Sequence, residues 1–322
     1  MHYLAVDIGG TAVKVGLVSA TGGVLNKASY PADFDGYKTP LQETALKGAE
    51  DFVCRMAQAK GLAEGSMKHL AQALELQGIG VSATCLIDTE KGRVVGSHIP
   101  NYQKAELKKH FEETFGLETR VINDANSAAL AELWTGSLKG CKNGILLTIG
   151  TGIGGGIIAD GRLLSGAHGF AGEVGHMSIK KDGPLAAYGN RGGYEEYAST
   201  KALLRRVEER LMEEGLPLPE EGLSGHWVFE QADRGDALME QILSEWIEDL
   251  MVGIENLVYI FDPERVVLGG GVSAQEKWLI KPLEERLHKK LMHAYQEHIR
   301  VLPATHLNDA GLIGAVYSFV EG

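Results

Sequence analysis

Short apolar segments separated by glycine pairs make up the first thirty residues. The segments span residues 3–7, 13–18 and 24–30, and the glycine pairs Gly9-Gly10 and Gly22-Gly23 lie between them. Short β-type segments with turn glycines between them are typical of antiparallel strands. The start of the chain is therefore expected to form a three-stranded meander.

A similar pattern returns near the middle of the chain. Apolar segments at 144–149 and 154–159 enclose the turn Gly150-Thr151-Gly152, and Asp160-Gly161 leads into residues 162–164. The segments VDIGGTAVKVGLV and LTIGTGIGGGIIA share a strand, a Gly/Thr turn and a second strand. Such a repeat indicates an internal duplication with one phosphate-binding hairpin in each half.

Apolar residues at helical spacing predict the remaining framework. Asp262-Pro263 is expected to end a long helix, because proline disfavours the helical conformation in the residue before it. The chain of 322 residues exceeds the usual size of one domain, so we expect an α/β protein of two domains. The predicted helices are 40–77 (interrupted at Gly61 and Gly65), 105–115, 127–134, 195–215, 227–261, 282–293 and 309–320, and the further strands are 78–82, 119–122, 265–268 and 299–302.

Composition narrows the function classes. The content of 44% hydrophobic and 23% charged residues is that of an ordinary soluble globular protein. The formal charge of −12 argues against nonspecific binding to nucleic acid or to an anionic membrane, both of which need a basic surface. Three scattered cysteines make a disulfide framework improbable. With no signal-peptide pattern and no long apolar run, the expected location is cytoplasmic.

The first candidate site is the turn of the first hairpin. Glycines let backbone N–H groups approach a phosphate, and a threonine hydroxyl can donate a further hydrogen bond. A carboxylate at the end of the preceding strand could hold Mg²⁺. A simple hairpin turn is the alternative. The candidates are Asp7, Gly9, Gly10, Thr11 and Lys14.

The second candidate site is the turn of the repeated hairpin, with Thr151 and Gly152. Five glycines occur within residues 148–156, which is more than hairpin geometry needs. The segment is neither a Walker loop nor a Rossmann fingerprint, because no Gly-Lys-Ser/Thr follows and a hairpin replaces the strand-to-helix turn.

Polar side chains at two further places are candidates for the acceptor site. Asn123 and Asp124 follow a strand and precede a helix, where ligands bind in open α/β sheets, although either could only cap the helix. Asp124 could accept a hydroxyl proton while Asn123 positions the acceptor. Glu173 and His176, framed by glycines, suit neighbouring sugar hydroxyls, the alternatives being a surface glutamate and a core histidine. Glu195 and Glu196 could equally compensate a helix dipole.

Taken together, six segments in this order resemble the ROK family of sugar kinases and sugar-responsive repressors, in the actin-like ATPase superfamily. The resemblance implies a two-lobed actin-like (ribonuclease H-like) fold, in which each lobe is a mixed sheet flanked by helices and the ligands bind in the cleft. The smaller lobe would comprise residues 1–118 and about 304–322, and the larger lobe residues 119–303. The segments are VDIGGTAVKVGLV, NDANSAALAE, LTIGTGIGGGII, GFAGEVGHM, VVLGGGV and DAGLIGA.

The resemblance also implies roles for single residues. Asp124 resembles the base that deprotonates the sugar hydroxyl, and adenosine of ATP would lie near Gly269, Gly270 and Gly271. Gly10, Thr11, Thr151 and Gly152 resemble the phosphate contacts. The sugar-binding set would be Asn101, Asn123, Glu173, His176 and Glu195.

Two departures from the family pattern matter. Many members carry a structural zinc bound by the histidine and three cysteines, but here Ala186, Tyr188 and Gly193 stand at the cysteine positions. His176 alone cannot form a closed four-ligand site, so no zinc is expected and packing through Tyr188 and Tyr194 is expected to hold the loop. Cys85 stands where relatives usually have glycine near the sugar, which puts the identity of the sugar in doubt.

We therefore expect ATP- and Mg²⁺-dependent transfer of a phosphoryl group to a hexose, at the 6-hydroxyl of glucose, mannose, N-acetylmannosamine or a β-glucoside. One alternative is a sugar sensor without catalysis, against which the phosphate hairpins and Asp124 argue. Another is an acetate-type kinase, for which an arginine clamp would be expected. The resemblance suggests a homodimer. DNA binding is not expected, because the first hairpin starts the chain and no helix-turn-helix precedes it.

Overall fold

The computed structural model describes residues 1–186 and 189–321. The chain divides into two compact units: unit 1 comprises residues 1–139, 165–171 and 308–322, and unit 2 comprises residues 140–164 and 172–307. The lobes expected from the sequence divide the chain at residues 118 and 303, and these boundaries stay a prediction.

Unit 1 is built on a five-stranded sheet in the order β3-β2-β1-β4-β7. The first three strands form the predicted antiparallel meander, and β4 and β7 add in parallel to β1. A small hairpin, β5-β6, was not predicted from the sequence. The strands are β1 (His2–Ile8), β2 (Ala12–Ser19), β3 (Val24–Pro31), β4 (Leu76–Ala83), β5 (Leu86–Asp88), β6 (Arg93–Gly96) and β7 (Thr119–Asn123).

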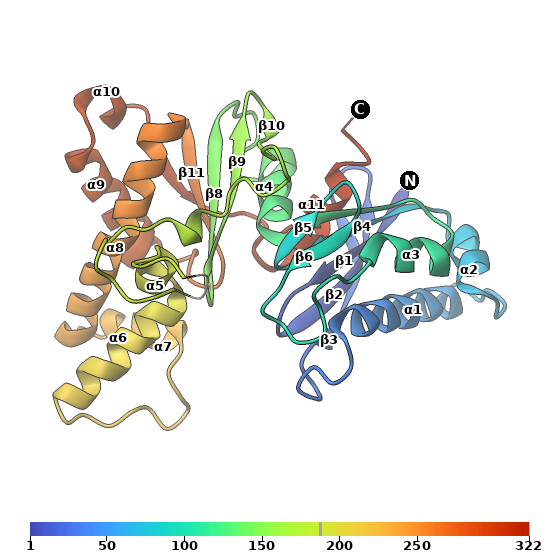
Figure 1. Cartoon of the computed structure of the whole chain (residues 1–322), viewed down its shortest axis with the longest axis horizontal. Coiled ribbons are helices and arrows are strands. Elements are labelled where there is room, and N and C mark those ends of the chain that lie inside the picture. Colours follow the sequence, from blue (N-terminus) through green and yellow to red (C-terminus); the bar gives the residue numbers. More distant parts are fainter. Residues whose placement is uncertain (187–188, 322) are drawn as a thin grey trace. The chain divides into compact units, whose positions relative to one another are not determined.

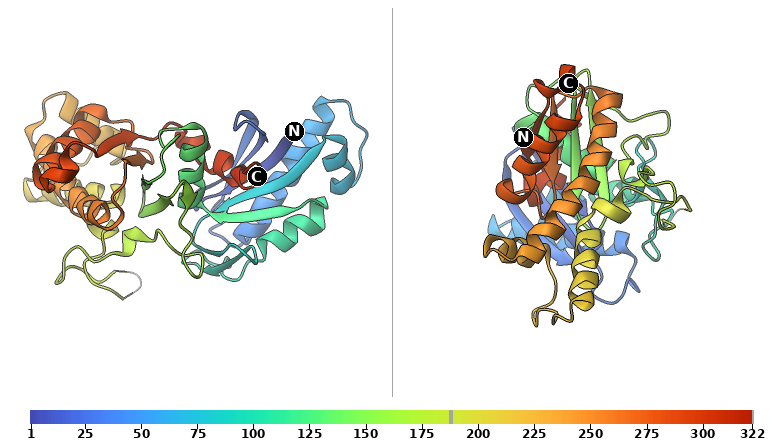
Figure 2. Two further views of the ribbon diagram at one scale, coloured as in Figure 1. Left: turned by 90° about the horizontal axis from the view of Figure 1, so that it is seen from above. Right: turned by 90° about the vertical axis from the view of Figure 1, so that its left-hand side faces the viewer.

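Helices cover both faces of this sheet (Figures 1 and 2). Leu4, Val6 and Ile8 of β1 belong to the core that contains residues of α1, α2 and α3. The alternate residues Tyr3 and Ala5 pack with the last helix, α11, because successive side chains of a strand point to opposite faces. The helices of unit 1 are α1 (Leu41–Ala59), α2 (Met67–Ala73), α3 (Leu107–Phe115), α4 (Asp124–Thr135), a 3₁₀ turn (Leu307–Asp309) and α11 (Ala310–Tyr317).

Unit 2 repeats this strand arrangement. Its sheet has the order β10-β9-β8-β11-β12, in which β8 and β9 form an antiparallel hairpin and β11 and β12 run parallel to β8. The duplication predicted from the two glycine turns thus extends to the order of all five strands. The strands are β8 (Gly144–Ile149), β9 (Ile153–Ala159), β10 (Arg162–Leu163), β11 (Arg265–Gly269) and β12 (Arg300–Pro303).

The long helix predicted for residues 227–261 is in fact two helices. Gly235 has a left-handed backbone (φ +87°) that ends the first helix, and the Asp236 carboxylate accepts hydrogen bonds from the backbone N–H groups of Leu238 and Met239, which caps the second. No helix in the described part of the chain is long and apolar enough to span a bilayer. The helices of unit 2 are η1 (Val174–His176), α5 (Glu195–Ala198), α6 (Thr200–Glu213), α7 (Gly225–Asp233), α8 (Ala237–Phe261), η2 (Glu276–Ile280), α9 (Lys281–Lys290) and α10 (His293–Gln296).

Candidate active site

The first glycine turn joins β1 to β2 in unit 1. The Gly9 N–H donates to the Ala12 carbonyl at 3.0 Å, and a Cβ atom on Gly9 would lie 3.1 Å from that oxygen. Gly9 therefore has little room for a side chain, and the turn is tight. Thr11, at the tip of the turn, is exposed. The turn thus presents backbone and a hydroxyl group, as the sequence predicts for a phosphate contact.

Asp7, at the end of β1, lies against the start of α11. Its carboxylate is 3.3 Å from Lys14 Nζ and accepts a hydrogen bond from Ser82 Oγ at 2.8 Å. A Cβ atom on Gly311 would be 2.3 Å from Asp7 Oδ1, so glycine is required for this close approach. One carboxylate together with phosphate oxygens is a donor set that Mg²⁺ accepts. The residues at this turn fit such an ion.

Tyr37 connects the first turn with Asn101. The Tyr37 hydroxyl donates to the Gly10 carbonyl oxygen, and Asn101 Nδ2 donates to the Tyr37 carbonyl oxygen at 3.2 Å. Tyr37 and Asn101 both have left-handed backbone conformations, with φ of +60° and +57°. Such conformations are uncommon in residues other than glycine and are often found at functional sites. Asn101 and the first glycine turn therefore belong to one connected group of unit 1.

Asn123 and Asp124 lie where β7 passes into α4. Asn123 is the N-cap: its Oδ1 accepts from the N–H groups of Ala125 and Asn126 at 2.9 and 3.1 Å. Its Nδ2 donates to the carbonyl of Cys85 at 3.1 Å. Asp124 is the first residue of the helix, which therefore begins three residues before the predicted start at Ser127. The capping alternative thus describes Asn123 correctly.

Cys85 follows β4 and contacts the same region. It has a left-handed backbone (φ +75°), and its Sγ lies 3.4 Å from Ser97 Oγ. Burial raises the pKa of the Cys85 thiol; hydrogen bonds with Ser97 and Thr84 lower it and the charge of Asp124 raises it, each to a smaller extent. Because the thiolate is the nucleophilic form, Cys85 is unsuited to nucleophilic catalysis. The contact of Cys85 with Asn123 is made by its backbone carbonyl, and its thiol contacts Ser97.

The second glycine turn, in unit 2, contacts Glu195 directly. Glu195 Oε2 accepts from the Ile153 N–H at 3.3 Å, and a Cβ atom on Gly152 would be 2.4 Å from that oxygen. Glycine at 152 therefore leaves room for the carboxylate. Glu195 is the first residue of α5. Its carboxylate bonds to the turn between β8 and β9, so it does more than compensate the dipole of its own short helix.

Glu173, His176 and Glu195 form one cluster. His176 Nε2 is 3.7 Å from Glu173 Oε2, and His176 Nδ1 is 3.6 Å from Glu195 Oε1. Burial raises the pKa of the Glu173 carboxyl; His176 lowers it and Glu195 raises it, each to a smaller extent. Side chains that can both donate and accept hydrogen bonds, gathered in a partly buried position, suit a ligand rich in hydroxyl groups.

The zinc of many family members does not fit this loop. Ala186 and Gly193 supply no metal ligand, and Tyr188, which was expected to help to hold the loop, lies outside the described residues. In the described chain, no group of three or more His, Cys, Asp or Glu side chains is arranged to hold a metal. Tyr194 is fully buried, and its hydroxyl donates to the Leu250 carbonyl at 2.6 Å.

The third glycine segment follows β11. Gly270 has φ +94°, and a Cβ atom there would lie 2.1 Å from the Ile149 carbonyl oxygen, so a side chain is excluded. Ser273 Oγ donates to the Gly270 carbonyl oxygen at 2.8 Å. Gly271 lines a pocket of about 890 Å³ together with Thr151 of the second glycine turn.

Most of the pocket wall was not predicted from the sequence. It comes from α6 and from the segment between α6 and α7, which carry no glycine motif. Helical spacing in α6 indicated only a packed face, and no sequence signal showed that α6 also lines a pocket. The additional lining residues include Thr200, Lys201, Leu204, Arg205, Glu208, Leu218, Pro219, Leu223 and His226.

Two sheets of one strand order, each with a glycine turn at its first hairpin, are the architecture of the actin-like sugar kinases, and the protein is an ATP-dependent sugar kinase of this class. The chain belongs to the ROK family, whose family model matches residues 3–321. Family, fold class and enzyme class are thus confirmed.

Relatives and solved structures cover almost the entire chain. A β-glucoside kinase of Listeria monocytogenes is 33% identical over 100% of this chain and 98% of that protein. A glucokinase of Thermotoga maritima is 31% identical over 98% of this chain and 96% of that protein. The structure of a ROK family glucokinase from Streptomyces griseus, in complex with glucose and AMPPNP, has a TM-score of 0.78 at 28% identity and covers 98% of each chain.

Proposed function

We propose that the enzyme transfers the γ-phosphoryl group of ATP to the 6-hydroxyl group of a hexose, and that Asp124 is the general base. The observation that carries this proposal is the position of Asp124, which follows the parallel strand β7 as the first residue of α4. Asn123 accepts hydrogen bonds from the N–H groups of Ala125 and Asn126, and Asp124 Oδ1 accepts a further hydrogen bond from the Ala125 N–H at 2.8 Å. Ligands of open α/β sheets bind at the carboxyl ends of the strands, and the Asp124 carboxylate lies at such an end.

In the proposed reaction, the hydroxyl oxygen of the sugar attacks the γ-phosphorus of ATP. A bond forms between these two atoms, the bond from the γ-phosphorus to the bridging oxygen breaks, and ADP leaves with that oxygen. Asp124 accepts the proton of the hydroxyl group. Bound Mg²⁺, for which Asp7 is the proposed ligand, supplies positive charge that offsets the charge of the phosphates.

We assign sugar recognition to the Glu173–His176–Glu195 cluster, with Asn101 and Asn123 as further contacts. Carboxylates accept hydrogen bonds from two hydroxyl groups, and a histidine ring offers one donor and one acceptor when neutral. The distances of 3.6 and 3.7 Å between His176 and the two carboxylates support a joint role. The sugar is proposed to be glucose, mannose, N-acetylmannosamine or a β-glucoside, in keeping with the glucokinases and β-glucoside kinases among the relatives.

We assign the nucleotide to unit 2. Thr151 and Gly152 would contact phosphate, and the pocket lined by Gly271, Leu204 and His226 would take the adenosine. A pocket of about 890 Å³ has the size that small-molecule ligands occupy. Gly10, Thr11 and Lys14 of unit 1 are the further proposed phosphate contacts.

The test is a coupled assay of ADP release with MgATP and a panel of glucose, mannose, N-acetylmannosamine and cellobiose, followed by mass spectrometry of the product. We expect sugar-dependent ADP release with one class of sugar and a product heavier by one phosphoryl group. A folded protein that binds a panel sugar but releases no ADP would instead indicate a sugar sensor. Light scattering and EDTA titration test the homodimer and the Mg²⁺ requirement that we also propose from the family.

A further inference from the structure

The loop that follows His176 (described residues 177–186 and 189–194) joins two members of the sugar-binding cluster. It begins after His176 and ends immediately before Glu195. The side chains of His176 and Glu195 lie 3.6 Å apart. Its two ends are held together by the Tyr194 N–H, which donates to the Met177 carbonyl at 2.7 Å. Asn190 Nδ2 donates to the His176 carbonyl at 2.8 Å. The position of this loop therefore sets the distance between two of the proposed sugar ligands.

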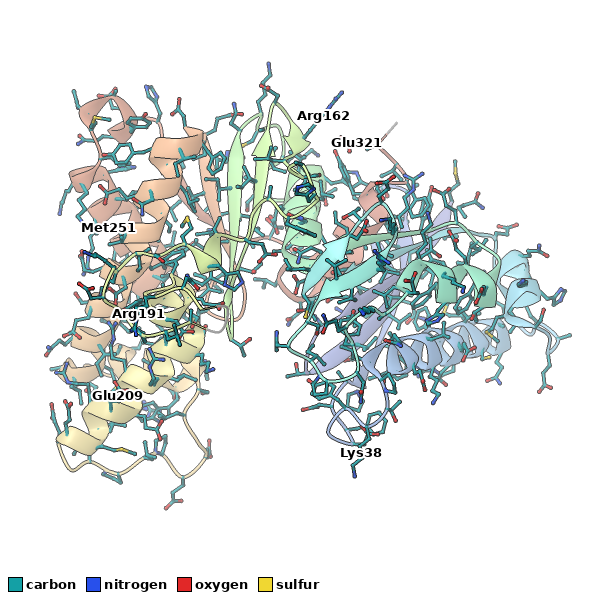
Figure 3. All side chains as sticks on the ribbon, viewed as in Figure 1. Lys38, Arg162, Arg191, Glu209, Met251 and Glu321 are labelled. Atoms are coloured by element: carbon teal, nitrogen blue, oxygen red, sulfur yellow. The ribbon has the colours of Figure 1, made fainter. Side chains whose placement is uncertain are left out.

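Two sets of contacts hold the loop against α8, and the first of them also involves α6. Lys180 Nζ lies 3.0 Å from Asp249 Oδ1 on α8, and Arg206 of α6 pairs with the other oxygen of the same carboxylate. We call Lys180, Arg206 and Asp249 the Asp249 triad. Figure 3 labels Arg191 in the loop and Met251 on α8, close in sequence to these attachments.

The second attachment is Tyr194. Its ring fits against Gly253, where a Cβ atom would lie 2.2 Å from the nearest ring atom. Its buried hydroxyl group donates a hydrogen bond to the Leu250 carbonyl oxygen. Both attachments end on one turn of α8, because residues 249, 250 and 253 are one to four positions apart.

We propose that the Asp249 triad and Tyr194 take the place of a structural metal, and that Lys180 and Asp249 are positioning residues for the sugar-binding cluster. A closed zinc site would fix the loop through four ligands, and the donors for it are absent here. The triad offers the same kind of fixation, since one nearly buried carboxylate binds a cation from the loop and a cation from α6. This inference rests on the proposed sugar site.

The position of Lys180 separates this role from a general contribution to stability. Its side chain is half exposed and also lies over the ring of Tyr197, 4.3 Å from its centre. Replacing Lys180 removes neither partner of the ion pair between Arg206 and Asp249, so we expect that pair to remain. Loss of Lys180 therefore releases the loop from α8 at this point and leaves the helices joined.

The experiment compares Lys180→Met with the matched control Lys277→Met. Lys277 makes the same two kinds of contact, an ion pair of 2.8 Å with Asp233 and a cation–π contact of 4.4 Å with Trp278. Neither partner of Lys277 contacts the sugar-binding cluster in any interaction described above. Steady-state kinetics with the active panel sugar, thermal unfolding and zinc analysis are measured for wild type, both variants and Asp249→Asn.

We expect Lys180→Met to raise the KM for sugar roughly 2- to 30-fold, the range found for residues that couple to a site without touching its ligand. The KM for ATP should stay within about twofold of wild type, and Lys277→Met should match wild type for both substrates. Asp249→Asn should raise the sugar KM further and lower the unfolding temperature. Wild-type protein should contain no stoichiometric zinc, and EDTA with excess Mg²⁺ should not change the sugar KM.

Two results would overturn the inference: equal sugar KM values for Lys180→Met and Lys277→Met, or stoichiometric zinc whose removal raises the sugar KM. A wild-type enzyme without sugar-dependent ADP release is a different failure, because it would overturn the proposed function itself. Sugar affinity measured by calorimetry still tests the positioning role in that case.

Discussion

The side chain of Asn123 caps the helix that begins with Asp124. Its Oδ1 accepts hydrogen bonds from two backbone N–H groups at 2.9 and 3.1 Å, and its Nδ2 donates a hydrogen bond to the carbonyl oxygen of Cys85. These bonds fix the backbone of Asp124 between a strand and a helix. A general base needs such a fixed position, because proton transfer depends on the distance to the hydroxyl group. Single substitutions can separate the capping role of Asn123 from the proposed catalytic role of Asp124.

Replacing Asp124 by Asn should remove catalysis and keep binding. The amide has nearly the same shape but cannot take the proton of the sugar, so kcat should fall by roughly 10²- to 10⁴-fold. The dissociation constant for sugar, measured by calorimetry, should change little. A variant that retains more than about half of the wild-type kcat would exclude Asp124 as the base.

Substitutions of Asn123 test its structural role. Asn123→Ala should reduce the free energy of unfolding by about 1 kcal/mol, because the Asn126 N–H loses its acceptor and the Ala125 N–H keeps only Asp124 Oδ1. Asn123→Ser can still cap the helix and should recover most of this loss in urea titrations. If Asn123 also contacts the sugar, the serine variant should be stable and yet have a raised sugar KM. Equal stability of the alanine variant and wild type would contradict the cap.

The raised pKa of Glu173 predicts a pH dependence of sugar binding. Burial raises the pKa of this carboxyl above its ordinary value, so it becomes protonated at a higher pH than an exposed glutamate. Only the carboxylate accepts hydrogen bonds with both oxygens, so the sugar KM should rise as the pH falls through this pKa. In Glu173→Gln the KM should be higher at neutral pH and flat over the same range. Identical pH profiles would refute a role for the Glu173 charge.

The same pKa has a consequence for stability. Because the folded pKa exceeds the unfolded one, the folded state binds more protons between the two values, and stability falls as the pH rises through this window. In Glu173→Gln, which has no carboxyl group at this position, the stability should not fall over this pH window. Its unfolding temperature should therefore equal that of wild type below the unfolded pKa and exceed it at neutral pH, as measured by calorimetry across the pH series.

Filling the pocket of unit 2 tests the assignment of the nucleotide. Leu204 on α6 lines this pocket, and Leu204→Trp should raise the KM for ATP by about tenfold, a loss of about 1.4 kcal/mol in binding. Met212 lies on the same helix and is 62% exposed, so Met212→Trp is the matched control and should leave both KM values unchanged. A raised sugar KM with an unchanged ATP KM in Leu204→Trp would argue against this assignment.

The helices and strands that could be predicted from the sequence are those marked by a local residue pattern. The glycine turns at Gly9-Gly10 and Gly150-Thr151-Gly152 and the proline after Asp262 indicated the hairpins and the end of α8 correctly. Gly235 was missed, because the apolar periodicity on both of its sides concealed a left-handed residue. The short strands β5 and β6 also escaped detection, since three or four residues give little pattern.

Contacts between distant segments could not be inferred from local patterns. In the sequence, nothing distinguishes Gly253 from other residues of its predicted helix. In the structure, its lack of a side chain leaves space for the ring of Tyr194, 59 positions earlier in the chain. Likewise, nothing near Lys180 indicates that it pairs with Asp249. Such pairs depend on the packing of α8 against the loop, and only three-dimensional structure reveals them.

The packing of α11 has a consequence for the order of events during protein synthesis. Leu312 and Val316 of this helix complete a core with Tyr3, Ala5 and Val18 from the first two strands. The ribosome makes these two sets of residues about three hundred positions apart, so unit 1 can close this core only after residue 316 has been translated. Residues 140–164 and 172–307 of unit 2 are all made before then. The half of the kinase that is synthesised first is thus the half that can finish folding last, against the usual order in which amino-terminal domains fold first.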